Sequence, residues 1–185
     1  MAMYTIYKHC PVFRNEQITL RPVLEEDAPG LLNCYADQKA VPLFNADNCN
    51  GDTFYYPTAE RMKQALDFWR YSYDTEQFVR MTIIWNPTNE IIGSVEMFNR
   101  GEAPGYGVHG VLRIDVMSVY EQEEVLNAVL ELVQEHFYTE FGVEWIMTKA
   151  IHAAAARRAV LTGQGYIPLK EFELSDYYGR VKKEL

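Results

Sequence analysis

The clearest pattern in the chain lies between residues 111 and 148, where two short apolar runs flank one long amphipathic segment. Residues 111–117 are rich in β-branched side chains, which is typical of a strand. Apolar residues then recur at helical spacing up to Phe141, and Gly142 supplies the expected end of a helix. Residues 143–148 form a second apolar run. Strand, helix and strand with short joins predict a βαβ unit with parallel strands and a right-handed crossover.

The start of this helix is the first candidate for a binding site. Ser118 and Glu121 have the spacing of a capping box, in which each side chain satisfies a backbone N–H group of the other residue. The first turn of a helix also presents unpaired N–H groups and the positive end of the helix dipole. Such a junction is suited to bind an anion, usually a phosphate.

Shorter patterns predict the remaining elements. Thr58 caps a helix whose apolar positions follow from Met62 at i+3, i+4 and i+7. Residues 78–85 and 91–98 predict two strands around a turn, and a Gly-rich link at 99–110 leads into the βαβ unit. The other expected elements are a strand at 18–23, a helix at 25–35, a loop at 37–57, a helix at 152–161, an extended piece at 166–169 and a final hairpin of 170–174 with 180–185. We expect an extended N-terminal arm at 1–16 and a single domain at 17–185.

Composition and charge narrow the classes of function. The net charge is −9 and the pI near 4.9, which argues against a nucleic-acid partner and leaves room for a basic ligand such as an amine. Cys10, Cys34 and Cys49 form neither a disulfide framework nor a zinc motif. No signal peptide and no apolar run of transmembrane length occur, so we expect a cytoplasmic protein without a membrane partner. The aromatic content of 14% indicates either a lined cleft or a homodimer interface.

Other motifs carry little chemistry. Gly105-Tyr-Gly-Val-His-Gly110 matches the dinucleotide-binding G-x-G-x-x-G, but a strand rather than a helix follows it, so a loop between strands is expected. The four histidines have no ligand spacing, which predicts no metal site. His109, placed in the expected loop, is the histidine most suited to catalysis. No serine lies in a nucleophile elbow.

Two carboxylates on the expected sheet are the candidate catalytic residues. Glu96 lies on the second strand of the hairpin and Asp115 on the next strand. A carboxylate on a half-buried strand can take a proton from an ammonium substrate. The alternative is that strand alternation points one or both of them into solvent.

With its elements in this order, the chain resembles the GNAT acyltransferase superfamily, in particular the ribosomal-protein N-terminal acetyltransferase branch. I-T-L-R-P-V-L-E-E-D-A from Ile18 resembles the first strand and helix of that branch, and I-I-G-S-V-E-M-F from Ile91 its third strand. G-Q-G-Y-I-P-L from Gly163 resembles the Gly-aromatic pair after the fourth helix. The resemblance covers nearly the whole chain from Gln17. It implies an α/β fold with a mixed, strongly twisted sheet, in which antiparallel N-terminal strands lead into the parallel βαβ unit and helices lie on both faces.

The resemblance also implies a function. It is that of an N-acyltransferase that moves an acyl group directly from acetyl-CoA to an amine of a small molecule or peptide, with Glu96 or Asp115, directly or through water, as the base. In the family, the fourth strand offers backbone groups to the pantetheine arm, the next loop binds the pyrophosphate, and the fourth helix helps to hold the arm. The corresponding positions here are Val116, Met117, Ser118, Tyr120, Gln122 and His152.

The loop departs from the family pattern Q/R-x-x-G-x-G/A at its three defining positions, which are occupied by Glu121, Glu124 and Leu126. With Glu123, three carboxylates crowd the expected pyrophosphate site, and each like charge costs on the order of 1–4 kcal/mol at a surface-like dielectric. A second function therefore stays open, that of a catalytically degenerate GNAT-fold protein that binds a different ligand or partner in the same cleft. Arg157 and Arg158 on the fourth helix are candidates to restore the lost positive charge.

Overall fold

The computed structural model describes residues 5–170 and 174–183, and at its centre lies an eight-stranded sheet. The strand order is β1-β2-β3-β4-β5-β6-β8-β7. Every neighbouring pair is antiparallel except β5 with β6. The strands are β1 (Phe13–Arg14), β2 (Ile18–Pro22), β3 (Val79–Trp85), β4 (Glu90–Ala103), β5 (Gly107–Val116), β6 (Trp145–Lys149), β7 (Ile167–Pro168) and β8 (Tyr177–Val181). This mixed α/β sheet confirms the expected fold class.

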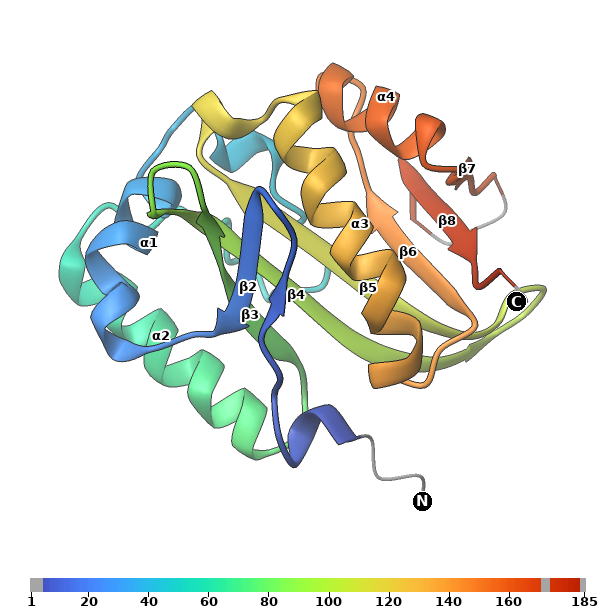
Figure 1. Cartoon of the computed structure of the whole chain (residues 1–185), viewed down its shortest axis with the longest axis horizontal. Coiled ribbons are helices and arrows are strands. Elements are labelled where there is room, and N and C mark those ends of the chain that lie inside the picture. Colours follow the sequence, from blue (N-terminus) through green and yellow to red (C-terminus); the bar gives the residue numbers. More distant parts are fainter. Residues whose placement is uncertain (1–4, 171–173, 184–185) are drawn as a thin grey trace.

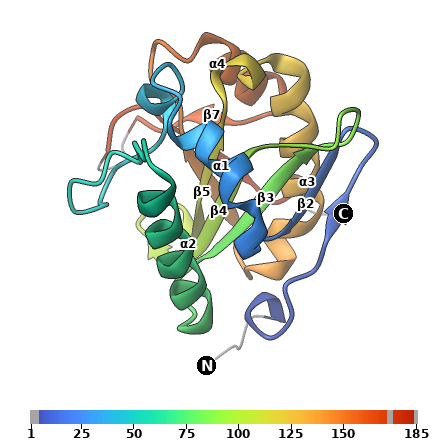
Figure 2. The same cartoon turned by 90° about the vertical axis from the view of Figure 1, so that its left-hand side faces the viewer.

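Four α-helices cover the two faces of the sheet (Figures 1 and 2). Helices α1 (Ala28–Tyr35) and α2 (Ala59–Asp74) pack together on one face, and α3 (Glu123–Glu140) lies across the other with α4 (Ala155–Gly163) beside it. Short 3₁₀ helices lie at Thr5–Tyr7, Glu25–Asp27, Val41–Leu43 and Ser118–Tyr120. The arm predicted at 1–16 contributes Ile6 and Phe13 to the buried core, and its β1 pairs with β2.

The predicted βαβ unit is confirmed as β5, α3 and β6. Residue Gly142, with φ of +60°, follows the last turn of α3, a backbone conformation that glycine adopts without strain. At the start of α2, the Thr58 side chain accepts a hydrogen bond from the Arg61 N–H at 3.2 Å, as the sequence predicted. Strands β5 and β6 pair only from His109 with Trp145 to Leu112 with Thr148, whereas β5 continues to Val116. The two parallel strands therefore separate at that end.

Two sequence predictions were wrong. The expected link at 99–110 is a hairpin, because β4 runs on to Ala103 and β5 begins at Gly107 across an irregularity between Asn99 and Gly101. His109 is consequently a buried strand residue and not a loop residue. At the C-terminal end, β8 begins inside the expected turn and pairs with β6 and β7. Of the strand expected at 170–174, residues 171–173 lie outside the described residues.

Gly93 allows β4 and β5 to approach closely, and this generates a prediction about stability. A Cβ atom added at Gly93 would lie 1.9 Å from the backbone oxygen of Asp115, whereas one added at Gly163 meets nothing within 4 Å. Gly93→Ala should lower the free energy of unfolding by about 3 kcal/mol or more, because the obstacle is backbone. Gly163→Ala, the matched control at the end of α4, should change it by less than about 1 kcal/mol. Urea unfolding measures both, and equal effects would contradict the prediction.

The start of α1 is fixed by a buried carboxylate. Asp27 accepts hydrogen bonds from Arg21 at 2.7 and 2.6 Å, from the Thr82 hydroxyl at 2.7 Å and from the Leu24 N–H at 2.9 Å. Burial alone would raise the pKa of Asp27, but the hydrogen bonds from Arg21 and Thr82 outweigh it and lower that pKa below its ordinary value. The charged form therefore stabilises the fold.

This lowered pKa predicts a pH-dependent contribution. In the unfolded chain the Asp27 carboxyl titrates at about pH 3.9. The stabilisation should therefore be complete above that pH and should disappear as the pH falls through the lower pKa of the folded state. Asp27→Asn should cost roughly 2 kcal/mol at pH 7. The difference from wild type should shrink in urea titrations as the pH falls below about 4. Asp67→Asn, at an exposed position of α2, is the control, and a pH-independent loss at Asp27 would refute the assignment.

Candidate functional site

A row of charged side chains crosses the centre of the sheet. The strand register places Arg80 of β3 opposite Glu96 of β4, and Glu96 opposite Arg113 of β5. These residues are 5%, 3% and 9% exposed, respectively. Their side chains share the face covered by α1 and α2, because residues directly opposite each other on neighbouring strands point to the same side of a sheet. Three charges that water would normally solvate are thus held inside the protein.

Arg80, at one end of this row, makes most of its hydrogen bonds. Its Nε donates to Glu96 at 3.1 Å, and its Nη2 makes a short contact with the same carboxylate oxygen. Its Nη1 donates to the Tyr35 hydroxyl at 2.7 Å, to Ser94 at 3.0 Å and to Asp115 at 3.0 Å. Burial alone would lower the pKa of Arg80, but the charge of Glu96 outweighs it and holds that pKa well above its ordinary value.

Asp115 belongs to the same network, but it lies deeper. The Tyr35 hydroxyl donates to it at 2.8 Å and also lies 2.7 Å from the Ser94 hydroxyl. Burial raises the pKa of Tyr35, so the phenol stays protonated and remains a donor. The indole of Trp69 covers the Arg80 guanidinium at 4.4 Å, a cation–π contact that closes the network on the α2 side.

A cavity of about 410 Å³ opens on this face of the sheet. Glu96 and Arg113 lie in its lining, and Asp115 does not. Half of the other lining residues are aromatic, namely Phe54, Tyr56, Phe68, Trp69, Phe78, Phe98 and Tyr177. Its volume is within the usual range for sites that bind small molecules.

The structure answers where the two predicted carboxylates point. Neither Glu96 nor Asp115 faces solvent, and Arg80 brings them together, so the solvent-facing alternative was wrong for both. Sequence reasoning missed Arg80 and Arg113. Period-two alternation in F-V-R-M-T and V-L-R-I-D offered a signal, because it places each arginine on the same face as an inward-pointing neighbour two residues away. The strand register that brings both beside Glu96 was not available from the sequence.

The junction between β5 and α3 differs from the predicted capping box. Helix α3 begins at Glu123 after Gln122, without a hydrogen bond from a capping side chain, and residues 118–120 form a separate 3₁₀ helix. The Ser118 N–H donates to the Asp37 carboxylate at 2.7 Å. Burial alone would raise the pKa of Asp37, but this N–H and that of Lys39 stabilise its charged form and lower the pKa. A protein carboxylate therefore occupies one backbone donor of the junction.

Glu121 is bridged to α4. Arg157 donates from Nε and Nη2 to the two oxygens of Glu121, each at 2.8 Å, and the two side chains are only 5% and 9% exposed. Glu124 accepts a hydrogen bond from Gln17 at 2.6 Å. The charge of Glu121 is therefore balanced inside the protein, and the bridge joins the loop before α3 to the first turn of α4. Arg157 is not free to replace the missing positive charge.

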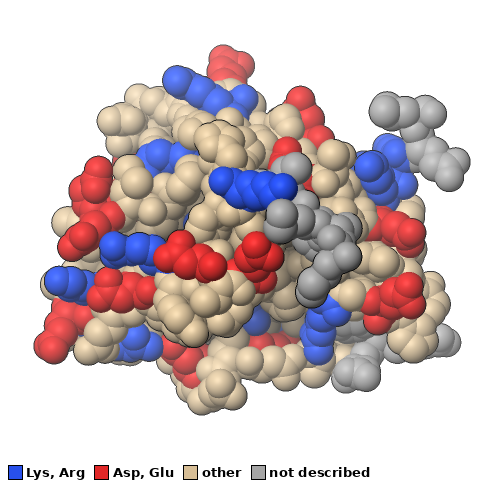
Figure 3. All heavy atoms as spheres, turned by 90° about the horizontal axis from the view of Figure 1, so that it is seen from below, with Lys and Arg blue, Asp and Glu red and all other residues tan. Residues whose placement is uncertain are grey.

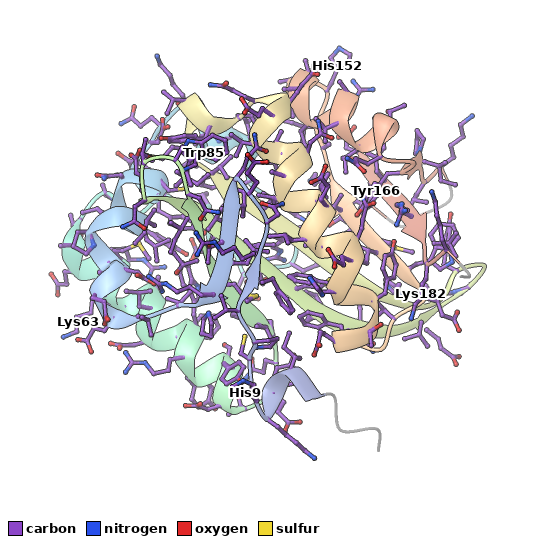
Figure 4. The ribbon with its side chains drawn as sticks, in the orientation of Figure 1. His9, Lys63, Trp85, His152, Tyr166 and Lys182 are labelled. Atoms are coloured by element: carbon purple, nitrogen blue, oxygen red, sulfur yellow. The ribbon has the colours of Figure 1, made fainter. Side chains whose placement is uncertain are left out.

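The other residues expected to hold the cofactor have different surroundings. Val116 and Met117 are buried, the Tyr120 hydroxyl donates to Glu90 at 2.5 Å, and the Gln122 amide makes a short contact with the Val119 carbonyl. His152 is exposed in the turn that precedes α4, where its Nδ1 lies 2.7 Å from Arg158 (Figure 4). Arg158 also donates to the Tyr178 hydroxyl at 2.8 Å.

These observations test whether the loop fits the pyrophosphate of acetyl-CoA. Residues 117–126 contain no glycine and no residue with positive φ, and Leu126 is buried in the core. A glycine cradle, in which successive N–H groups approach a phosphate closely, is absent from this described segment. Together with the Glu121–Arg157 bridge, this means that the residues as they stand do not fit acetyl-CoA held in the standard way.

Charged side chains of both signs are mixed on the face of the molecule seen from below. Lys and Arg are interspersed with Asp and Glu over the face shown in Figure 3. Among the described residues, no group of His, Cys, Asp and Glu side chains is placed to hold a metal ion. Nor does any helix in residues 5–170 and 174–183 have the length and apolar character needed to cross a bilayer.

Comparison with known proteins identifies the family of the chain and several structures that share its fold. A family model described as an acetyltransferase (GNAT) domain matches residues 17–167, and no curated protein matches the chain. The structure of Mycobacterium smegmatis RimJ in complex with CoA-disulfide is similar with a TM-score of 0.68 at 16% identity, over 89% of this chain and 81% of that one. A ribosomal-protein-S5-alanine acetyltransferase from Vibrio fischeri gives 0.64 at 16%, over 94% and 98%. A GNAT-family acetyltransferase from Bacillus anthracis gives 0.70 at 10%, over 94% and 100%. At these identities the structures show a shared fold.

The hydrogen bonds of the charged row predict a large loss of stability when Arg80 is replaced. Arg80→Met should lower the free energy of unfolding by about 3–5 kcal/mol, because Asp115 loses its arginine and Glu96 loses the closer of its two. Arg70→Met, at an exposed position of α2, should change stability by less than about 0.5 kcal/mol. Guanidinium chloride unfolding at pH 7 measures both. A loss below about 1 kcal/mol at Arg80 would show that the network does not hold the strands together.

Proposed function

The chain belongs to the acetyltransferase (GNAT) domain family, and on that premise we propose that it is an N-acyltransferase that holds an acceptor amine in the cavity beside Glu96. Family membership supports acyl transfer in general. The observation that carries the more specific proposal is the position of a buried carboxylate in the lining of a cavity sized for a small molecule.

Glu96 is suited to receive the amine. An ammonium group in the cavity is attracted to this carboxylate, and direct transfer requires that the amine lose a proton before it attacks. Glu96 accepts that proton directly or through a water molecule. Its Oε2 is already bonded to Arg80, so Oε1, which lies 3.4 Å from Arg113, is the oxygen left for this role. Asp115 does not line the cavity, so we assign it a positioning role through Arg80.

The donor side of the proposal is the altered one. Acetyl-CoA, when bound, supplies the acyl thioester. The Glu121–Arg157 bridge and the glycine-free loop mean that its pyrophosphate is not held by the standard cradle. The backbone at Val116, Met117 and Ser118 remains the proposed position of the cofactor's arm. We assign no step of the reaction to the cofactor.

The acceptor and the cellular setting are also part of the proposal. Similar structures include RimJ and a ribosomal-protein-S5-alanine acetyltransferase, which supports a peptide amine as one type of acceptor. The enclosed aromatic cavity supports a small molecule as the other. A cytoplasmic location is supported by three cysteines that are free thiols in the structure.

A specific observation favours a second candidate function. Because the same buried bridge occupies the loop, the chain can instead be a degenerate member of the family that binds a different ligand or partner in the cavity without transferring an acyl group. The two candidates differ in whether acetyl-CoA binds at all.

Calorimetric titration of acetyl-CoA into wild type and Glu121→Gln separates them. If the protein is an acyltransferase, wild type should bind acetyl-CoA weakly. Glu121→Gln should bind about tenfold more tightly or better, because one fewer carboxylate near the phosphates is worth roughly 1–4 kcal/mol and Arg157 is released. Glu131→Gln makes the same charge change at an exposed position of α3 and should leave binding unchanged.

The second candidate predicts a different result. No heat with either protein at millimolar acetyl-CoA, while circular dichroism shows both folded, would overturn the acyltransferase proposal and leave ligand binding in the cavity. Equal gains in Glu121→Gln and Glu131→Gln would show that net charge alone acts and that the bridge has no specific role.

A further inference from the structure

The two arginines beside Glu96 are bonded very differently. All three nitrogens of Arg80 donate to oxygen acceptors of the protein. Arg113 donates from Nη2 to the Asp47 carbonyl at 3.0 Å and from Nη1 to the Cys49 sulfur at 3.0 Å. Its Nε, although buried, has no acceptor among the described residues. Since sulfur is a weak acceptor, the Arg113 guanidinium is left with unused hydrogen-bonding capacity.

An under-bonded buried guanidinium is unusual. Buried polar groups nearly always have partners, because leaving one unpaired forfeits the hydrogen bond that water would provide. Arg113 and Cys49 both line the cavity, so a ligand there can replace the weak sulfur acceptor on the Arg113 guanidinium with an oxygen. The best match to its planar fork is a carboxylate, which accepts two parallel N–H groups at once.

The charges around the cavity also favour a negatively charged ligand. Each acidic residue in the lining already has a basic partner outside it: Asp47 is paired with Lys149, Asp52 with Arg61, and Glu96 with Arg80. The basic residues of the lining have no acidic partner to themselves. Arg113 shares Glu96 with Arg80, and Arg100, exposed in the lining, forms no ion pair within the described part of the chain. The cavity of this acidic protein therefore has spare positive charge.

The wall defines the rest of the ligand. Phe54, Tyr56, Trp69, Phe78 and Phe98 surround the space with aromatic rings. Aromatic surfaces favour a flat apolar body, and rings gain further from edge or offset contacts with one another. A volume of about 410 Å³ accommodates a ligand of the size of an amino acid and not a long chain.

We propose that the ligand of the cavity carries a carboxylate on an aromatic body, and that Arg113 is the residue that binds this carboxylate. In combination with the proposed function, on which this part rests, the acceptor is an amine of the aromatic amino-acid class, with its amino group at Glu96 and its carboxylate at Arg113. Arg113 is then the residue that determines specificity, and Arg100 adds attraction at the rim.

Three ligands that share one ring test this assignment on the full chain without any acyl donor. They are 3-phenylpropionate, which has only the anion, phenethylamine, which has only the amine, and L-phenylalanine, which has both. Isothermal titration should show 3-phenylpropionate and L-phenylalanine binding about tenfold more tightly than phenethylamine, or better, since a charge-assisted bond distinguishes them.

Substitutions identify the residue responsible. Arg113→Gln should reduce the affinity for both carboxylates to that for phenethylamine. Arg113→Lys keeps the charge without the fork and should retain part of the preference, which also serves if the glutamine variant does not fold. Arg14→Gln, at an exposed position of β1, is the matched control and should leave the preference unchanged.

Several results would overturn the assignment. These are phenethylamine binding as tightly as 3-phenylpropionate, a carboxylate preference that persists in folded Arg113→Gln, and no binding of any of the three ligands at millimolar concentration. Failure of acyl transfer is distinguishable, because 3-phenylpropionate has no amine and the assay contains no donor. Its binding together with silent acetyl-CoA titrations would keep this inference and reject the transfer reaction.

Discussion

The side chains of Arg80, Glu96 and Arg113 form one buried row, which connects the sheet to the two helices on that face. The row joins three strands, and Arg80 extends it to α1 through Tyr35 and to α2 through the ring of Trp69. A buried charge is tolerated only while its partners are in place, so such a network permits few arrangements of the elements that carry it. The cavity wall is therefore fixed before any ligand arrives.

One carboxylate shared by two arginines explains why the cavity is electrically asymmetric. Glu96 gives its Oε2 to Arg80 at close range and leaves Arg113 a contact of 3.4 Å through Oε1. Since Asp115 also bonds to Arg80, this network contains two arginines and two carboxylates, and yet one arginine holds most of the bonds. A chain with a net charge of −9 can therefore present positive character in this cavity. Net charge describes the surface of such a protein and says little about its binding site.

Structural features that depend on neighbouring residues were predicted from the sequence, and contacts between distant residues were not. Thr58 as a cap, Gly142 as a helix end and the period of α3 each depend on a few neighbouring residues, which is why they were confirmed. The hairpin between β4 and β5 was missed because its glycines are typical of loops, whereas here they pair across a bulge. Glu96 was a candidate from its strand position alone. Arg113 was not, because its partners come from segments 64 and 66 residues away.

The difference between neighbours in the sequence and neighbours in space also matters for the loop before α3. In the sequence, Glu121, Glu123 and Glu124 form an acidic cluster that would repel phosphate. In space, Glu121 is neutralised by Arg157, 36 residues away, so the local charge is smaller than the count of carboxylates. The greater obstacle is steric and structural, because a buried ion pair now bridges two elements in a segment where the family has glycine. Breaking one member of such a pair leaves the other charge uncompensated, and a ligand that enters here must provide the replacement partner. A phosphate could do so for Arg157 but not for Glu121, and for that reason the carboxylate, and not the arginine, is the residue that opposes an anion at this junction.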